Sequence, residues 1–269
     1  MPLKEIHDSN RCLIGAHLHP WVNPPHDEQV SRYNSLPGNL DRELENAKLG
    51  KLVDVIETNL GVKSKVYEAG RYGLGPNTPR ILDELDFEVD LSGDPPFNYR
   101  PEGPDYSSWK SEPYWFGEEY RLLGIPCTGS FIGFMRTFPK LYRFAQRQFL
   151  QKLRVQGIFS RLNVIDRLRL SPEYYESNEH VKLTNELLKS GVRSFTFSFH
   201  SPSLKPGCTP FVRDEAELGK FLDKMRRYFD FFFGKLGGKS MTALEFREFL
   251  LRLNQPKMGN EKPDSASVQ

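Results

Sequence analysis

Apolar residues along the chain fall into two kinds of pattern that alternate with one another. Short apolar runs typical of buried strands occupy residues 12–18, 65–69, 87–91, 125–131 and 192–199. Apolar residues at three- and four-residue spacing predict helices over residues 39–60, 183–188, 214–236 and 244–253. Strands that alternate with helices indicate an α/β fold with a mostly parallel sheet, open or closed into a barrel.

The domain organisation that these patterns predict is simple. Residues 1–253 are expected to form a single domain, because no internal repeat or linker divides them. Residues 254–269 carry almost no large apolar side chains and are expected to form a disordered tail.

Composition narrows the class of protein. The chain has 37 Lys and Arg against 35 Asp and Glu, and this near-neutral balance gives no electrostatic reason to expect nucleic-acid binding. No apolar run approaches the roughly 20 residues of a membrane-spanning helix, and the polar start MPLKEIHDSN is not a secretory signal. Cys12, Cys127 and Cys208 are odd in number and far apart, so neither a disulfide framework nor a zinc ribbon is expected. We expect a cytoplasmic protein.

The end of the first predicted strand carries two histidines. In the sequence HLHPW, His17 and His19 are two residues apart and therefore point to the same side of a strand. Two such imidazoles form half of a zinc site, and functional residues of parallel sheets collect at strand ends. The alternative is that both rings only hydrogen-bond loop carbonyls. His26 follows in the next turn and is a further candidate ligand.

Other polar residues follow the later predicted strands. Arg71 lies in a glycine-rich turn, where it either orients a carboxylate or forms a surface ion pair. Asp90 closes the third apolar run as a functional or a turn-capping carboxylate. His200 follows the last run, as a general acid or base or as a loop anchor. His7 and His180 lie in polar stretches and are expected to be solvated.

Residues 98–116 hold three Tyr, two Trp and one Phe among polar and turn residues. Exposed aromatic rings of this kind suit stacking on a sugar, whereas the alternative is a long loop held to the surface by its own aromatics. The residues expected to contact a sugar are Tyr72, Tyr99, Asp105, Trp109 and Trp115. The basic stretch 136–169 is interpreted as a solvated helix face, with an acidic or phosphate-bearing partner as the less favoured alternative.

An ordered set of motifs carries a resemblance to a known family. HLHPW and NPP are followed by AGRYG, by VD-x-S, by SFHSPSL with PGCTPFVRD, and by FFFGKLGG. Together they resemble the polysaccharide deacetylases of the NodB-homology class, specifically the WalW-like branch, over nearly the whole of residues 12–253.

The resemblance implies a distorted, incomplete (β/α) barrel that removes N-acetyl groups from a surface-polysaccharide sugar or its precursor. It implies a divalent metal, usually zinc, held by His17 and His19 together with an aspartate, while a second aspartate acts as general base. By the same resemblance His200 is the general acid, Arg71 orients the base and Asp90 positions His200.

This sequence departs from the family pattern in two places. The histidine spacing is His-x-His instead of His-x-x-x-His, so His26 is a possible third or replacement ligand. The family's aspartate pair lies on a strand that precedes the histidines, and no such strand precedes Cys12. We therefore expect an N-terminally truncated deacetylase domain with an unpaired sheet edge, and the chain as given is either part of a longer product or an inactive remnant.

Two other classes of function compete with this interpretation. A non-catalytic glycan-binding remnant would use the aromatic segment 98–116, and its sugar binding would survive a chelator or His19→Ala. A metal phosphoesterase or amidohydrolase with His-x-His as its first ligand pair is less favoured. Such a site needs several more ligands, and only His26, His180 and His200 remain to supply them.

Overall fold

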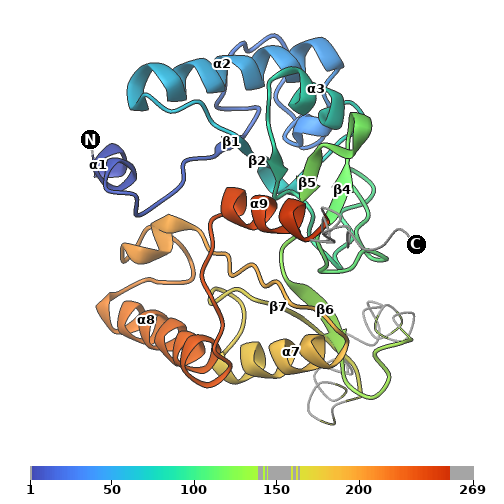
Figure 1. Ribbon diagram of the computed structural model, residues 1–269, viewed down its shortest axis with the longest axis vertical. Helices are drawn as coiled ribbons and strands as arrows, with labels where there is room; N and C mark the ends of the chain where they lie inside the picture. The colour runs from blue at the N-terminus through green and yellow to red at the C-terminus, as the bar shows by residue number, and fades with distance from the viewer. Residues whose placement is uncertain are drawn as a thin grey trace, which may run out of the picture.

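The computed structural model describes residues 2–138, 142, 144, 159, 162 and 164–254, and its elements gather in two halves (Figure 1). The large-sheet half contains β1 (Ala16–Leu18), β2 (Val66–Ala69), β3 (Val89–Asp90), β4 (Tyr114–Phe116), β5 (Leu122–Gly124), α2 (Arg42–Leu60), α3 (Thr78–Glu84) and α9 (Ala243–Asn254). The small-sheet half contains β6 (Gly129–Ile132), β7 (Asp166–Arg169), α7 (Ser177–Lys189) and α8 (Glu215–Phe229). A short helix, α1 (Pro2–Asp8), precedes both halves.

The large sheet has the strand order β1-β2-β3-β5-β4. Its first four strands are parallel, and β4 pairs antiparallel with β5. The small sheet is the antiparallel pair β6 and β7. The predicted α/β class with a mostly parallel sheet is confirmed, whereas the distorted, incomplete (β/α) barrel stays a prediction.

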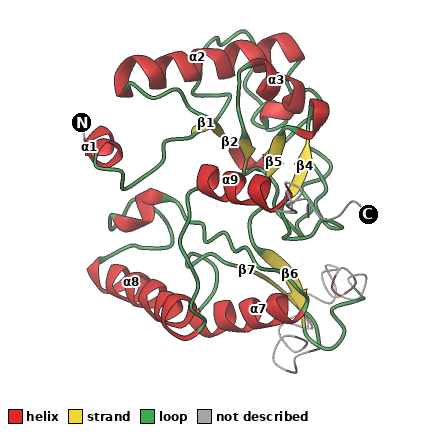
Figure 2. Cartoon of the chain, in the orientation of Figure 1, coloured by secondary structure: helices red, strands yellow, loops and turns green. Residues whose placement is uncertain are grey.

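Helix α2 covers one face of the large sheet, and α9 covers the other (Figure 2). The Asp41 carboxylate caps the start of α2 by accepting a hydrogen bond from Leu44 N at 2.8 Å, and Gly61, with φ 69°, ends the helix. The apolar stripe of α2 packs on Ala16, Leu18 and Tyr67, while Val66 and Val89 contact α9. Adjacent strand residues face opposite sides, so both faces of the sheet are buried as a parallel sheet requires.

The small-sheet half departs from the prediction at residues 192–199. We expected a strand there, but the backbone forms no ladder with a neighbouring strand. Val192 N donates to Leu187 O at 3.0 Å, Thr196 N to the Thr128 hydroxyl at 2.7 Å, and Ser198 N to Leu170 O at 3.1 Å. Instead, the Phe197 ring packs on Phe229 at the end of α8, and the Phe195 ring packs on Phe232 in the turn that follows this helix. The alternating aromatic residues therefore pack through their rings, and the backbone of this segment does not pair with a strand.

His180 corrects a second expectation, because it is completely buried and not solvated. Its Nε2 lies 3.0 Å from Ser171 O, and its ring contacts the rings of Phe197 and Tyr228 edge-on. The polar neighbours of His180 in the sequence lie on the opposite side of α7, which is strongly amphipathic, with Leu183 and Leu187 on the buried side.

Both helices predicted after residue 200 are present in the structure. The predicted helix at 214–236 is confirmed as α8 and a π-helical turn over Asp230–Lys235, and the predicted helix at 244–253 is α9. β4, β5 and β7 were not predicted, because strands of only three or four residues show too little periodicity in the sequence. Most of the basic stretch 136–169 and the tail 255–269 lie outside the described residues. Among the helices that the structure describes, none is long and apolar enough to cross a bilayer.

Candidate functional site

The histidine pair is placed by the pleat of β1. Ala16 and Leu18 are buried against α2, so His17 projects from the opposite face of the sheet, as the two-residue period requires. The His17 and His19 rings lie edge to face with their centroids 4.4 Å apart. The expectation that the two rings lie together is confirmed.

Glu68 stands beside this pair. In the parallel register of β1 and β2 it is the direct partner of His17, and so it lies on the same face. Nδ1 of His17 donates to Glu68 O at 3.0 Å, and Glu68 Oε2 lies 3.8 Å from the same nitrogen. This bond fixes the ring of His17 and leaves Nε2 as the nitrogen that can act on a ligand.

Burial shifts the pKa values of the side chains at this site. It lowers the pKa of His17, and it lowers the pKa of His19 to about 4, with further lowering from the charges of His17, His200 and Arg71. Burial also raises the pKa of Glu68 to about 7, against the lowering effect of His200. The charge of His200 thus acts on the pKa of all three side chains from the small-sheet half.

His200 is held by a buried glutamate. Its backbone N–H donates to Glu173 Oε1 at 3.0 Å, and its Nδ1 donates to Glu173 Oε2 at 2.8 Å. The Ser203 hydroxyl donates to Glu173 Oε1 at 2.6 Å. The Glu173 side chain is only 1% exposed, whereas that of His200 is 65% exposed. The arrangement presents His200 to solvent with Nδ1 engaged and Nε2 left for proton transfer.

Asp90, which we expected to position His200, lies on the other face of the sheet. It is paired in register with Tyr67, which faces α2. Its carboxylate accepts bonds from the backbone N–H and the hydroxyl of Ser92, and burial raises its pKa to about 7. The partner of His200 is thus Glu173 and not Asp90, and a catalytic role for Asp90 stays a prediction without a contact that supports it.

Arg71 and Tyr72 occupy a tight turn at the end of β2. Both have left-handed backbone angles, with φ of 56° and 59°, which non-glycine residues adopt only where the surroundings hold them. Arg71 is exposed and donates to the Ser35 hydroxyl, while its charge reaches His19. No carboxylate partner of Arg71 is found in the described part of the chain, so its expected orienting role stays a prediction.

A buried ion pair ties the two halves together near this turn. Arg169 of β7 pairs with Asp94, which follows β3, and its guanidinium lies over the Tyr72 ring at 5.1 Å. Tyr99 donates to the same carboxylate and stacks on Tyr72 with centroids 5.8 Å apart. Tyr72 and Tyr99, both expected to contact sugar, are thus engaged in this network. Cys127 is buried beside it, and burial raises the pKa of its thiol to about 12.

The other expected sugar contacts are dispersed. Trp109 is 36% exposed, whereas Trp115 on β4 packs toward α9 beneath Arg247. Asp105 accepts a hydrogen bond from Ser107 N at 2.9 Å within the same loop. These contacts favour the alternative in which the loop is held by its own side chains, and sugar contact by these residues stays a prediction.

Sequence reasoning missed three residues of this site. Glu68 and Glu173 lie in apolar or turn segments, and only strand register and chain folding bring them to the histidines. Trp21 is 38% exposed, and its ring lies 4.5 Å from that of His19, which makes it an aromatic surface directly at the site. Its position in HLHPW next to the histidines was the available signal.

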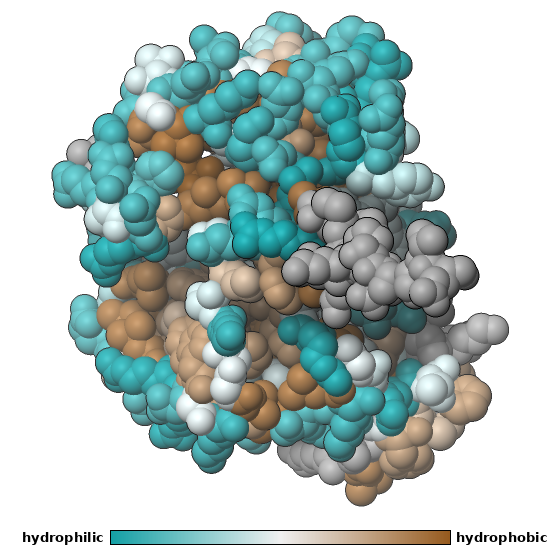
Figure 3. Space-filling model, viewed as in Figure 1, coloured by the Kyte–Doolittle hydropathy of each residue, from teal (hydrophilic) through white to brown (hydrophobic). Residues whose placement is uncertain are grey.

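On the face shown in Figure 3, apolar surface gathers in a hollow between the two halves.

The described residues do not make a complete zinc site. The bond from His17 Nδ1 to a backbone carbonyl is typical of a metal-ligating histidine. A catalytic zinc, however, takes three protein ligands, and the described residues contain no group of three or more His, Cys, Asp or Glu side chains that could hold a metal. His26 is exposed in its loop, with no recorded contact to the pair among the described residues.

Comparison with known proteins leaves the family open. No protein-family model matches the chain, and no curated protein matches it. A crystal structure of a protein from Mycobacterium smegmatis, provisionally described as a polysaccharide deacetylase, aligns with 46% of this chain at 19% identity and a TM-score of 0.32. The chain spans about a third (34%) of the length of that protein. A likeness at that TM-score is too partial to decide the fold or the activity of this chain.

Proposed function

We propose that the chain is a hydrolase-type domain that removes N-acetyl groups from a carbohydrate. The observation that carries the proposal is the assembly of His17, His19 and Glu68 opposite the His200–Glu173 pair, from chain segments more than 100 residues apart. The motif resemblance to polysaccharide deacetylases supports the same chemistry. Trp21 beside His19 offers an aromatic face of the kind on which a sugar ring packs.

In this proposal the residues take complementary parts in amide hydrolysis. Water attacks the acetyl carbonyl, and the Glu68 carboxylate accepts a proton from that water. His200, with Nδ1 held by Glu173, delivers a proton from Nε2 to the departing amine. The bond from the water oxygen to the carbonyl carbon forms, the C–N bond breaks, and the products are acetate and an amino sugar. The proton taken up by Glu68 is then released, and His200 is reprotonated from solvent. Glu173 acts through His200 and is a positioning residue.

Zinc is assigned no step, because the described residues supply two histidine ligands where three protein ligands are needed. His17 and His19 are the residues that would hold a metal if a further ligand joined them.

The test is acetate release from an N-acetylated oligosaccharide, measured on the same sample with added zinc and with a chelator. We expect release by the wild type and its loss in Glu68→Gln and His200→Ala. The matched control is His7→Ala, because His7 lies near the N-terminus and its ring bonds the Cys12 carbonyl. No acetate release under any condition would overturn the proposal.

The missing third ligand favours a second candidate, a non-catalytic glycan-binding domain. It predicts oligosaccharide binding without acetate release, unaffected by the chelator or by His19→Ala. Trp21→Ala would abolish that binding, whereas loss of binding in His19→Ala or with the chelator would contradict this candidate.

A further inference from the structure

Lys48 is a fully buried lysine in the middle of α2. Its ammonium donates to the carbonyl oxygens of Pro20 at 3.1 Å and Asn23 at 2.8 Å, and to that of Pro25. It also forms an ion pair with Glu28 Oε1 at 3.0 Å, and the Glu28 side chain is itself only 9% exposed. Lysine is almost never fully buried unless its charge is paired, and here every partner belongs to one loop, residues 20–28.

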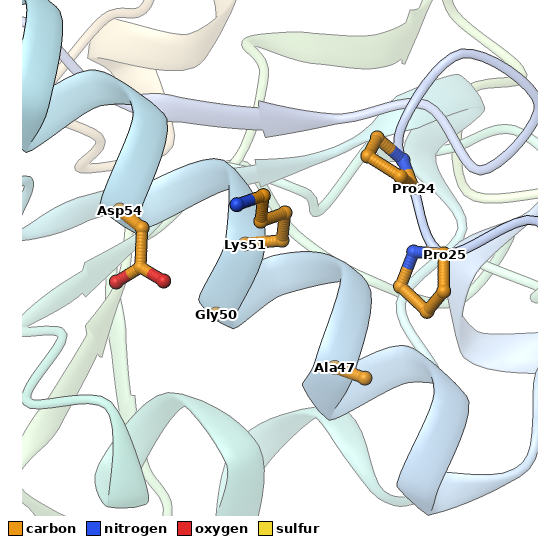
Figure 4. A pocket seen from close by; sticks show the side chains of 6 residues that line it. All are labelled: Pro24, Pro25, Ala47, Gly50, Lys51 and Asp54. Carbon is orange, nitrogen blue, oxygen red and sulfur yellow. The ribbon is translucent and has the colours of Figure 1, made fainter.

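Within this loop only Pro20 is buried, and residues 21–28 are exposed or half-buried. Residues 20–28 are all described, and none belongs to the three apolar clusters of the core. Between Pro24, Pro25 and α2 lies an open pocket of about 470 Å³, also lined by Ala47, Gly50, Lys51 and Asp54 (Figure 4). Because the loop and the helix leave this space between them, the polar contacts that join the loop to α2 among the described residues are those of the ammonium.

The loop is continuous with the histidine pair. The backbone N–H groups of Val22 and Asn23 donate to His19 O at 3.1 and 3.2 Å. The Asn23 side chain accepts in turn from His19 N at 3.2 Å. Asn23 therefore bonds both to His19 and, through its carbonyl, to Lys48, so a displacement of the loop displaces His19 and Trp21 with it.

We propose that Lys48 is a positioning residue, whose buried ammonium fixes the 20–28 loop and so sets the places of His19 and Trp21. Three carbonyl oxygens and one carboxylate surround it in the way that oxygen ligands surround a bound cation, with the cation supplied by the chain itself. The consequence for activity rests on the proposed function, whereas the consequence for the loop does not.

The first test is amide hydrogen exchange by NMR in the full chain. Lys48→Met keeps an unbranched side chain that is one atom shorter and removes its charge. We therefore expect the amides of Val22 and Asn23 to exchange about tenfold faster or more, while amides of α7 keep their rates. The matched control is Lys51→Met, one turn along the same helix, where the lysine is exposed. Unchanged exchange at Val22 and Asn23 in a folded Lys48→Met protein would overturn the proposal.

If Lys48→Met does not fold, Glu28→Gln decides the question. It keeps an acceptor oxygen and removes only the counter-charge, so a smaller acceleration of amide exchange, confined to the loop, is expected. No acceleration would overturn the proposal.

Acetate release separates this inference from the proposed function. Wild-type protein that releases no acetate refutes the hydrolase and leaves the exchange result standing. Where the wild type is active, Lys48→Met should raise KM more than Lys51→Met does.

Discussion

The two sides of the candidate site are positioned in different ways. His17 and Glu68 stand on paired strands, so the ladder of the large sheet fixes their separation. His200 ends an irregular segment, and it is the Glu173 carboxylate that fixes its place. The difference shows that hydrogen bonding between paired strands places every second side chain on the same face. A residue outside such a ladder instead needs a side-chain partner that fixes its position.

The strongest test of this comparison removes the side chain on the irregular segment. His200→Ala should lower kcat for acetate release by about 10²–10⁴, the usual contribution of a positioned general acid, with a smaller change in KM. Steady-state kinetics on an N-acetylated oligosaccharide measure it against His7→Ala. Equal kcat in the two variants would remove His200 from the proposed chemistry.

A second test separates the halves. Asp94→Asn leaves the buried Arg169 cation without its counter-charge, and breaking a buried pair in this way costs about 3–5 kcal/mol. Urea unfolding gives the free energy of unfolding. The control is Asp86→Asn, which breaks an exposed pair with Lys63 and should change stability little. Similar stabilities of the two variants would mean that the ion pair does not hold the halves together.

The third test uses pH and addresses the buried histidine of the small-sheet half. Burial lowers the pKa of His180 to about 4, from 6.5 in an unfolded chain, so the unfolded state binds more protons between these values. Its contribution to stability is therefore complete above pH 6.5 and falls as the pH drops toward 4, by on the order of 3 kcal/mol.

His180→Gln cannot gain that proton, so its free energy of unfolding should change less than that of the wild type between pH 7 and pH 4.5. Urea unfolding at both pH values measures the difference between the two proteins. Parallel pH dependence would show that His180 is not the buried neutral group described above.

The smallest expected effect concerns the positioning of His200. Glu173→Gln keeps an oxygen that can accept from the His200 backbone and from Ser203, but it loses the charge that holds the ring, so kcat should fall about tenfold. The ¹⁵N shifts of the His200 ring should show loss of the fixed Nδ1–H form, a signal that altered stability alone would leave in place. Ser203→Ala, which removes a single bond to Glu173, should retain that form.

Sequence reasoning succeeded where local pattern and structure coincide. The apolar stripe predicted α2, and the His-x-His spacing predicted two rings on one face of β1. It failed where contacts between distant residues decide the structure. Residues 192–199 have the two-residue period of a strand, yet they join no ladder, and the Phe195 and Phe197 rings pack on Phe232 and Phe229. Glu68 and Glu173 could not be found because no local pattern encodes strand register or a contact across 27 residues.

The three cysteines differ in exposure, and this difference permits selective labelling of the chain. Cys127 is buried with a raised thiol pKa, Cys12 is half-buried, and Cys208 is exposed eight residues after His200. A thiol reagent attacks the thiolate at an accessible sulfur, so Cys208 should be labelled first and Cys127 last. In a Cys12→Ala background, a single fluorophore on Cys208 would report from the segment that follows His200 without disturbing the buried core, so that changes in this segment on addition of an oligosaccharide could be followed in real time.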